Sequence, residues 1–395
     1  MPQLATKKDC TGCSACKQVC PKHCISMCED AVGVVLPSID TSLCIECKAC
    51  ERACPALNAP EFKSPRSSFA AWATDKEIRR ISASGGIASA IYKYVADNDG
   101  FSIGAVTDDE FRVKIKSFTL QDQDAIRNSK YTFSDAQEIY HMLRPAVKAG
   151  DLVVLIGLPC QTAGYRKYLG DHDNVIYIDL ICHGVTPNSY LRQHIKSLET
   201  QLNIDAHRLS FRAPEKGTAN YYFTLYGKDR DILYSKRSAD GEKYNLAFHR
   251  SYSYRENCYH CHYARRERCS DITIGDYHGL GEMAPCDFSD ENVSVILVNT
   301  SKGEAFVKRL ADSGLIEIHC RPTDEPIKGD LQLQRPSPKT CERIDFEKYI
   351  EKYGGDFETA IDKVLLLKAR RERITFFRQL PRRIIRKILK MLKLR

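Results

Sequence analysis

Two runs of four cysteines near the N-terminus share one spacing and one closing proline. The first is Cys10-x2-Cys13-x2-Cys16-x3-Cys20-Pro21, and the second is Cys44-x2-Cys47-x2-Cys50-x3-Cys54-Pro55. Four thiolates at this spacing hold a cubane 4Fe-4S cluster, and in two-cluster ferredoxins the fourth cysteine ligates the other cube. The pattern therefore predicts electron transfer through two clusters. The first cluster is held by Cys10, Cys13, Cys16 and Cys54, and the second by Cys20, Cys44, Cys47 and Cys50.

Zinc and disulfides are the alternatives for these eight thiols. Zinc sites typically use two CxxC pairs with a longer spacer, which three cysteines at successive x2 intervals do not match. Disulfides need an oxidising compartment. The segment between the two runs, residues 25–27 and 33–36, reads as a short hairpin, which fits a ferredoxin-like unit.

Length and composition indicate a globular, intracellular protein. A chain of 395 residues has room for two or three domains. Its eighteen cysteines favour a reducing compartment. Residues 1–8 lack the apolar stretch of a secretory signal, and no apolar run reaches the ~20 residues that span a bilayer. We expect a cytoplasmic protein. The absence of GxSxG and HExxH motifs argues against hydrolysis.

The positive charge is concentrated at the C-terminal end. Residues 363–395 hold thirteen Lys and Arg and one acid, Glu372, so the charge of this segment is +12. The net charge of the whole chain is +8, so the other residues together carry −4. The isoelectric point therefore does not indicate a nucleic-acid binder. After Pro381 the apolar and basic residues alternate at helical spacing, which predicts a short amphipathic helix that begins there. Contact with the inner membrane face, contact with an acidic partner, and a solvated tail without a partner are all open.

The remainder of the chain predicts an α+β fold. Strands are expected at 69–72, 152–156 and 175–182, and a helix at 87–97, without strict alternation of the two. The expected architecture is a two-cluster ferredoxin-like domain, then a mixed α/β core, then the short C-terminal helix. Four cysteines of this core stand at the ends of elements: Cys160, Cys182, Cys258 and Cys261. From spacing alone they are a metal site, a zinc site that uses Cys258, Cys261, His262 and Cys269, or small buried side chains.

Five short motifs follow one another in the core: residues 82–86 (SASGG), 129–131 (SKY), 157–164 (GLPCQTAG), 179–185 (DLICHGV), and 258–261 with 270–276 (CYHC and SDITIGD). Together they resemble the beta-subunit family of coenzyme F420-reducing hydrogenases and F420-linked dehydrogenases, to which a 7-hydroxymethyl chlorophyll a reductase is also similar. The resemblance covers roughly residues 68–330. It implies domains at 1–60 (ferredoxin type), 66–185 and 186–345 (N- and C-terminal domains of the beta subunit), with a basic helical tail at 346–395.

The resemblance also implies cofactors and site residues. It implies FAD and a third 4Fe-4S cluster held by Cys160, Cys182, Cys258 and Cys261, which leaves Cys269 as a bystander. The flavin contacts it implies are Ser84, Gly85 and Gly86 at a helix start, the pair Lys130 and Tyr131, and the loop that contains Pro159. His183 is the candidate proton donor at the flavin edge. Cys24, Cys28, Cys286, Cys320 and Cys341 match no ligand pattern and read as structural.

These inferences favour an iron–sulfur flavoprotein oxidoreductase. Electrons would pass between the clusters and FAD for a two-electron conversion of an organic substrate that the sequence does not identify. The alternative is a non-catalytic electron-transfer subunit that serves a partner enzyme, and a third possibility is a zinc-stabilised binding protein. Where family members often have Trp in Gly-Asp-Phe-Trp-Gly, this chain has His278, so the substrate face is expected to differ.

Overall fold

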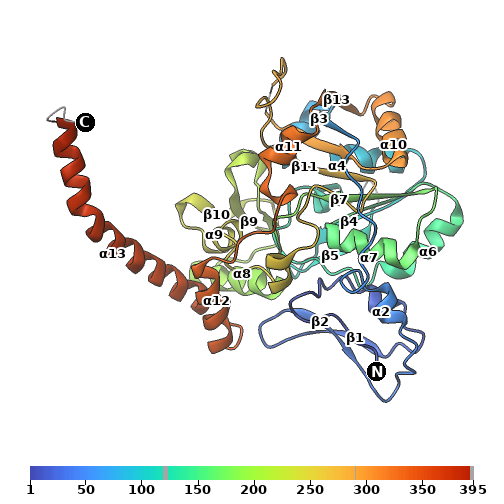
Figure 1. The fold of residues 1–395 in the computed structure, drawn as a ribbon, viewed down its shortest axis with the longest axis horizontal. Helices are drawn as coiled ribbons and strands as arrows, with labels where there is room; N and C mark the ends of the chain where they lie inside the picture. Colours follow the sequence, from blue (N-terminus) through green and yellow to red (C-terminus); the bar gives the residue numbers. More distant parts are fainter. Residues whose placement is uncertain (119–122, 290, 392–395) are drawn as a thin grey trace.

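The fold is built around one mixed eight-stranded sheet (Figure 1). The computed structural model describes residues 1–118, 123–289 and 291–391. The strands of this sheet, in spatial order, are β13 (Ile316–Arg321), β3 (Ser67–Ala73), β12 (Ser294–Val298), β11 (Ile272–Asp276), β7 (Val175–Leu180), β6 (Val153–Gly157), β4 (Phe101–Thr107) and β5 (Val113–Ser117).

The middle of the sheet is parallel and its margins are antiparallel. Strands β4, β6, β7 and β11 run in one direction, whereas β12 pairs antiparallel with β11 and β5 pairs antiparallel with β4. The prediction of a mixed α/β core is confirmed. The predicted strand at 152–156 corresponds to β6, and the predicted helix at 87–97 is α4 (Ile87–Asp97).

Both faces of the sheet are covered by helices, so alternate residues of each central strand enter different cores. Val154 and Ile156 of β6 pack with α4 and with α10 (Ser301–Asp312). Val153 and Leu155 of the same strand pack with α6 (Tyr140–Ala149) and α7 (Pro159–Leu169). A strand buried on both faces reads as a continuous apolar run, as this one does.

The N-terminal segment is a small unit that packs against α7. It contains α1 (Ala15–Gln18), the antiparallel hairpin β1 (Ile25–Glu29) and β2 (Val35–Ile39), and α2 (Ala49–Ala53). The predicted hairpin is therefore confirmed. Both α1 and α2 contact α7, so this unit lies against the end of the sheet from which α7 starts (Figure 1).

A second lobe follows β7. Helix α8 (Asn188–Leu202) packs on the three-stranded sheet β10 (Ile232–Arg237), β9 (Tyr222–Tyr226) and β8 (Arg208–Ser210). Further helices are α3 (Lys76–Ile81), α5 (Gln123–Ile126), α9 (Lys243–His249), α11 (Asp324–Gly329) and α12 (Cys341–Lys352). Short 3-10 turns join several of these elements, among them η5 (Glu256–His260).

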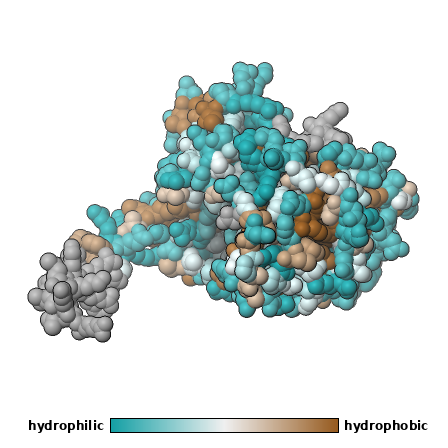
Figure 2. Space-filling model, turned by 90° about the horizontal axis from the view of Figure 1, so that it is seen from above, coloured by the Kyte–Doolittle hydropathy of each residue, from teal (hydrophilic) through white to brown (hydrophobic). Residues whose placement is uncertain are grey.

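The C-terminal helix is much longer than predicted. Helix α13 runs from Phe357 to Met391, so the expectation of a short helix that starts at Pro381 is wrong, and Pro381 lies inside the helix. The reason is packing: Phe357, Ile361 and Val364 are fully buried against α8 and α12, and a helix nucleated there extends readily. The helix then leaves the body (Figures 1 and 2). No helix among the described residues has the length and apolarity to cross a membrane.

Candidate functional site

Three pockets of the protein are each lined by four of the predicted cluster cysteines. The first lies in the N-terminal unit and is lined by Cys10, Cys13, Cys16 and Cys54. Cys13 precedes α1, Cys16 lies in α1, and Cys54 is the residue after the end of α2. The fourth thiol of the second run therefore lies with the first three thiols of the first run. Burial raises the pKa of the Cys13 thiol to about 12, because a bare thiolate is poorly solvated there.

The second pocket is lined by Cys20, Cys44, Cys47 and Cys50, and by a fifth cysteine, Cys24. The Sγ atoms of Cys20 and Cys24 lie 3.3 Å apart. Cys24 is buried, and the hydrogen bond with Cys20 is the main cause that raises its pKa to about 11. Cys24 matches no ligand spacing, and the sequence therefore predicts a structural role for it. The structure places it in the second pocket.

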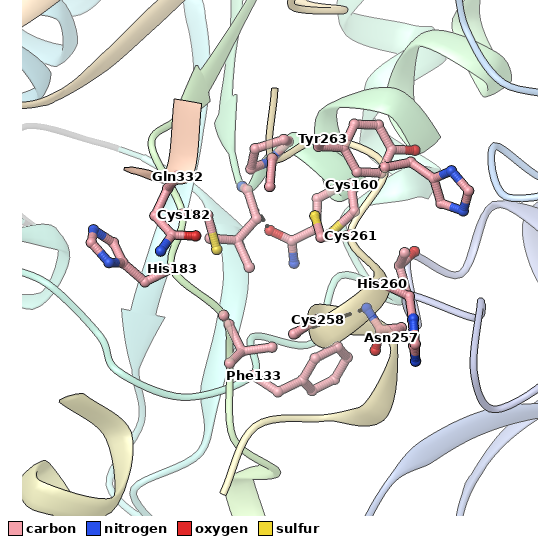
Figure 3. A pocket seen from close by; sticks show the side chains of 18 of the residues that line it. Phe133, Cys160, Cys182, His183, Asn257, Cys258, His260, Cys261, Tyr263 and Gln332 are labelled. Atoms are coloured by element: carbon pink, nitrogen blue, oxygen red, sulfur yellow. Dashed lines mark hydrogen bonds between the residues drawn. The ribbon is translucent and has the colours of Figure 1, made fainter. Parts of the chain in front are cut away.

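The third pocket lies in the core and is lined by Cys160, Cys182, Cys258 and Cys261 (Figure 3). Cys160 is the second residue of α7, which follows β6 after one residue, and Cys182 follows the neighbouring parallel strand β7. The carboxyl ends of adjacent parallel strands meet at one edge of a sheet, which brings these two thiols together. Cys258 lies in η5 and Cys261 follows it, facing the same space.

These core thiols are poor acids without a metal. Burial raises the pKa of Cys160 well above its usual value, and repulsion from Cys182, Cys261 and Cys258 adds to the effect. Burial likewise raises the pKa of Cys258 to about 11. The cationic iron–sulfide core of a bound cluster would lower these raised pKa values, because coordination to iron deprotonates a thiol. The donor set, four cysteine sulfurs around one pocket, fits a 4Fe-4S cluster.

The residues of the alternative zinc site are not all at this pocket. His262 lines it together with His260, but Cys269 does not. Cys269 is buried beside α7, packs on Ala163 and Tyr263, and directs its thiol toward the Pro159 carbonyl oxygen at 3.9 Å. Within the described ranges no three His, Cys, Asp or Glu side chains are close enough together to hold one metal ion. The remaining cysteines, Cys28, Cys320 and Cys341, are exposed, and Cys286 is half-buried.

The first and third thiol pockets are direct neighbours. Thr11, next to Cys10, lines both pockets, and Asp9 lines the third. Gly164, one turn after Cys160 in α7, faces Cys13 so closely that a Cβ atom there would lie 3.1 Å from the Cys13 Sγ. Helix α7 therefore touches both groups of thiols within two turns.

A larger cavity of about 510 Å³ adjoins the third pocket on its other side. Leu158, Gln161, His183 and Gln332 form the wall that the two spaces share. This volume is in the range of small-molecule and cofactor sites. The cavity lies at the carboxyl ends of β6, β7 and β11, where open α/β sheets bind their ligands.

The predicted SGG segment opens into this cavity at the start of α4. Ser84 and Gly86 line it, and Gly86 has φ +82°, the left-handed conformation that favours glycine. Gly85 is turned away: its N–H donates to Ser294 Oγ, and a Cβ atom would lie 2.4 Å from the Ala71 carbonyl oxygen. Gly85 is thus needed for close packing against β3, while its neighbours face the cavity.

Lys130 and Tyr131 also line the cavity, in fixed positions. The Lys130 ammonium donates to the carbonyl oxygens of Ile126, Arg127 and Asn128, at 2.5, 2.7 and 3.2 Å. The Tyr131 ring stacks on Phe248 with 4.5 Å between centroids. Pro159, the remaining predicted flavin contact, lines the third thiol pocket instead of the cavity.

Several polar residues that line the cavity form pairs that the sequence does not predict. Asp330 lies 4.0 Å from Nε2 of His183 and equally far from Nε2 of His278, so two histidines share one carboxylate. Arg212 donates to Asp276 at 2.8 Å, and its guanidinium lies over the Tyr221 ring. Local spacing cannot reveal such pairs, because their members are far apart in the chain.

Comparisons with known proteins agree with the motifs. Residues 150–323 match the family described as the C-terminal part of the beta subunit of coenzyme F420 hydrogenase/dehydrogenase, and residues 37–57 match a 4Fe-4S binding domain. The coenzyme F420 hydrogenase subunit beta of Methanococcus voltae is 24% identical over 271 residues, which cover 65% of this chain and 85% of that protein.

A chain of the xenon-derivatised F420-reducing [NiFe] hydrogenase complex from Methanosarcina barkeri is 20% identical, with a TM-score of 0.46, over 80% of this chain and 94% of that chain. The match at residues 37–57 confirms a 4Fe-4S binding motif at the second cysteine run, while the bounds 1–60 and the second cluster of the N-terminal unit stay predictions. The predicted family resemblance is confirmed as well: residues 150–323 are similar to the C-terminal part of the coenzyme F420 hydrogenase/dehydrogenase beta subunit, and residues 37–57 are similar to a 4Fe-4S binding domain.

Proposed function

We propose that this protein is an iron–sulfur electron-transfer subunit that exchanges electrons with a partner redox protein. The observation that carries the proposal is the row of three four-cysteine pockets that leads from the N-terminal unit to the large cavity of the core. The similar protein of Methanococcus voltae is named as a subunit of a hydrogenase, which favours a partner for this chain too.

In this proposal each pocket holds one 4Fe-4S cluster on its four cysteines. The N-terminal unit holds two and the core holds the third, and Cys24 and Cys269 remain free thiols. Fixed single-electron carriers need no rearrangement of the chain, and the rigid packing of α7 against both cysteine groups supports such a role. Burial and nearby charges then set the potentials.

We further propose that the large cavity takes FAD. The N-terminus of α4, an eleven-residue helix, presents free N–H groups where a diphosphate would be favoured, and Ser84 lies beside it. Tyr131, held by its stack on Phe248, offers a flat wall to an aromatic ring. A flavin, when bound, supplies the conversion between single-electron and two-electron chemistry. The shared wall of Leu158 and Gln161 would separate it from the core cluster by one layer of side chains.

The second candidate function is a complete oxidoreductase with its own organic substrate. The observation that favours it is the pair of histidines at the cavity mouth, because His183 and His278 around Asp330 could deliver a proton to a reduced acceptor.

Purification without oxygen tests the proposal. The full-length chain should contain about twelve iron and twelve acid-labile sulfide per chain, four of each for every cluster, and about one FAD by extraction and chromatography. An iron-free protein that contains zinc would overturn it. Reduction of bound flavin by dithionite-reduced viologen, without any turnover of added organic acceptors, favours the subunit over the complete enzyme.

For α13 we propose contact with an anionic membrane surface. Leu366, Ile374, Phe376 and Phe377 of α13 are exposed. Figure 2 shows apolar side chains along the part of the helix that extends from the body. The thirteen Lys and Arg of residues 363–395 surround them in the sequence. Apolar side chains among many cations are the combination that binds the interface of an acidic bilayer.

A further inference from the structure

Arg255 is a buried cation without an anionic partner. Its side chain is 1% exposed, and only Nη2 has hydrogen-bond partners, the carbonyl oxygens of Cys10 and Val35 at 3.3 and 3.0 Å. Its Nε and Nη1 atoms have none. An arginine side chain does not lose its charge in a protein. Burial of a charge without a counter-charge is costly, so this arrangement requires an explanation.

The other buried arginines differ from Arg255 in this respect. Arg268 donates to Asp179 at 3.0 Å, Arg212 donates to Asp276 at 2.8 Å, and Arg343 donates to Glu256 at 3.2 Å. Each of these three is therefore neutralised by a carboxylate. Arg255 has two carbonyl oxygens, and its guanidinium lies over the Phe133 ring at 4.5 Å.

The position of Arg255 is between two of the thiol pockets. Its Nη2 reaches the carbonyl of Cys10, a residue of the first pocket, and Arg255 lies three residues before Cys258 of the third pocket. The Cys258 N–H donates to the Arg255 carbonyl oxygen at 3.0 Å, which fixes the two relative to each other. Phe133, under the guanidinium, lines the third pocket as well.

The chain also keeps space for this guanidinium. Gly12, between Cys10 and Cys13, has φ +71°, and a Cβ atom there would lie 2.7 Å from Nη1 of Arg255. Gly12 therefore serves both the turn of the cysteine loop and the approach of the cation. The anionic clusters in the first and third pockets would supply the negative charge that Arg255 otherwise lacks.

We infer that Arg255 is a positioning residue that raises the reduction potentials of the first and third clusters together; this rests on the proposed function. A 4Fe-4S cube with four thiolates is anionic, and its one-electron reduction adds a further negative charge. A fixed cation in a dry interior stabilises the reduced form more than the oxidised form. In the N-terminal unit Arg255 contacts Cys10, Gly12 and Val35, and none of these residues lines the second pocket.

The test is a redox titration of the anaerobically purified full chain with dithionite, followed by electron paramagnetic resonance. In Arg255→Gln we expect two of the three reduction waves to move to lower potential, by on the order of tenfold in the one-electron equilibrium, about 59 mV. The third wave, from the second cluster, is the internal control and should not move. Arg255→Lys keeps the charge and should keep all three waves near their original positions.

The outcomes separate a charge effect from a structural one. If Arg255→Gln holds all its iron and its potentials equal those of the unchanged protein, the inference is overturned. If Arg255→Gln loses iron, Arg255→Lys decides: intact clusters at unchanged potentials support the role of the charge. Loss of iron in both variants overturns it, since the guanidinium is then only a structural clamp. Failure of the proposed function itself is distinguishable, because the unchanged protein would then show no iron at all.

Discussion

Gly164 of α7 and Cys13 of the N-terminal unit meet where the two parts of the chain join. A Cβ atom on Gly164 would lie 3.0 Å from the Cys13 Cβ and 3.1 Å from its Sγ. Because Cys160 is one turn earlier in the same helix, this contact sets how closely the first thiol pocket approaches the third. Only glycine permits that approach.

The first prediction concerns this contact. In Gly164→Ala the new methyl group would also lie 2.9 Å from the Tyr140 hydroxyl, which donates to the Cys13 carbonyl oxygen, so the Cys13 loop must shift. We expect altered resonance of the first cluster and slower reduction of the third, by about tenfold or more, because electron transfer depends on fixed geometry. Gly150→Asn is the control, since Gly150 has φ +87° and open space around it. Identical reduction rates in the two variants would contradict the prediction.

The second prediction separates the two adjacent thiols of the second pocket. Cys20→Ser should lose one cluster and fall to about eight iron per chain, because Cys20 has the ligand spacing. Cys24→Ser should keep about twelve, although its Sγ is only 3.3 Å from that of Cys20. Iron and sulfide analysis decides. The reverse result would exchange the roles of Cys20 and Cys24.

The third prediction applies the same logic to the core. Cys160→Ser removes a thiol that lines the third pocket and should leave about eight iron per chain. Cys269→Ser changes a buried thiol outside that pocket and should leave the iron content unchanged. Iron loss in Cys269→Ser with retention in Cys160→Ser would favour the rival ligand set.

How far the sequence predicts this molecule depends on whether a feature is local. Cysteine spacing is local, and the structure brings the two sets that it predicts to two separate pockets of the N-terminal unit. The core set, which only the family resemblance implied, lines a third pocket. Helix α4 is also local and begins and ends as expected. The sequence does not predict strand β10, because the apolar and polar residues of Ile232–Arg237 do not alternate, and the strand is stabilised by its pairing with β9. Arg255 and Asp330 have meaning only through partners that are distant in sequence.

The C-terminal helix illustrates the same limit. Pro381 is a good helix start on local grounds. Tertiary packing of Phe357 and Val364 starts the helix much earlier, and no local pattern contains that information. Similarly, residues 157–161 read as a loop, whereas Pro159 begins α7 with Leu158 as its N-cap.

The fourth prediction concerns pH and the anchor of α13. His194 lies between two carboxylates, with Nε2 2.6 Å from Glu242 and Nδ1 2.6 Å from Glu358 at the start of α13. Burial alone would lower the pKa of His194, but the hydrogen bonds to Glu242 and Glu358 outweigh it and raise the pKa to about 9. A raised pKa stabilises the folded state fully below the unfolded value near 6.5, and this contribution is lost as the pH rises through 9.

We therefore expect the free energy of unfolding to fall by about 2–3 kcal/mol between pH 6.5 and 9.5 from this group. Urea denaturation across that range measures it. In His194→Gln the slope should flatten, and the difference between the two curves isolates His194 from other groups that titrate there. Parallel curves would show that the imidazole is uncharged in the folded state.

The fifth prediction tests the proposed membrane contact, and the structure fixes where the chain should be cut. Val364 belongs to the core and Arg371 forms an ion pair with Asp345, so a deletion that begins before them would damage the fold. Removal of residues 374–395 spares both and removes eight of the thirteen basic residues. The full chain should sediment with vesicles that contain phosphatidylserine, whereas the truncated chain should not, since each cation near the surface contributes about 1 kcal/mol.

Vesicles of phosphatidylcholine alone provide the control for this fifth prediction, and binding to them should be weak in both chains. High salt should release the full chain from the acidic vesicles, because the attraction is screened within a Debye length. Equal sedimentation of the full and truncated chains would place the lipid contact elsewhere. If neither chain sediments with the acidic vesicles, the membrane proposal is wrong. The binding partner of α13 would then be an acidic protein, because exposed Phe376 and Phe377 among many cations indicate an interaction surface.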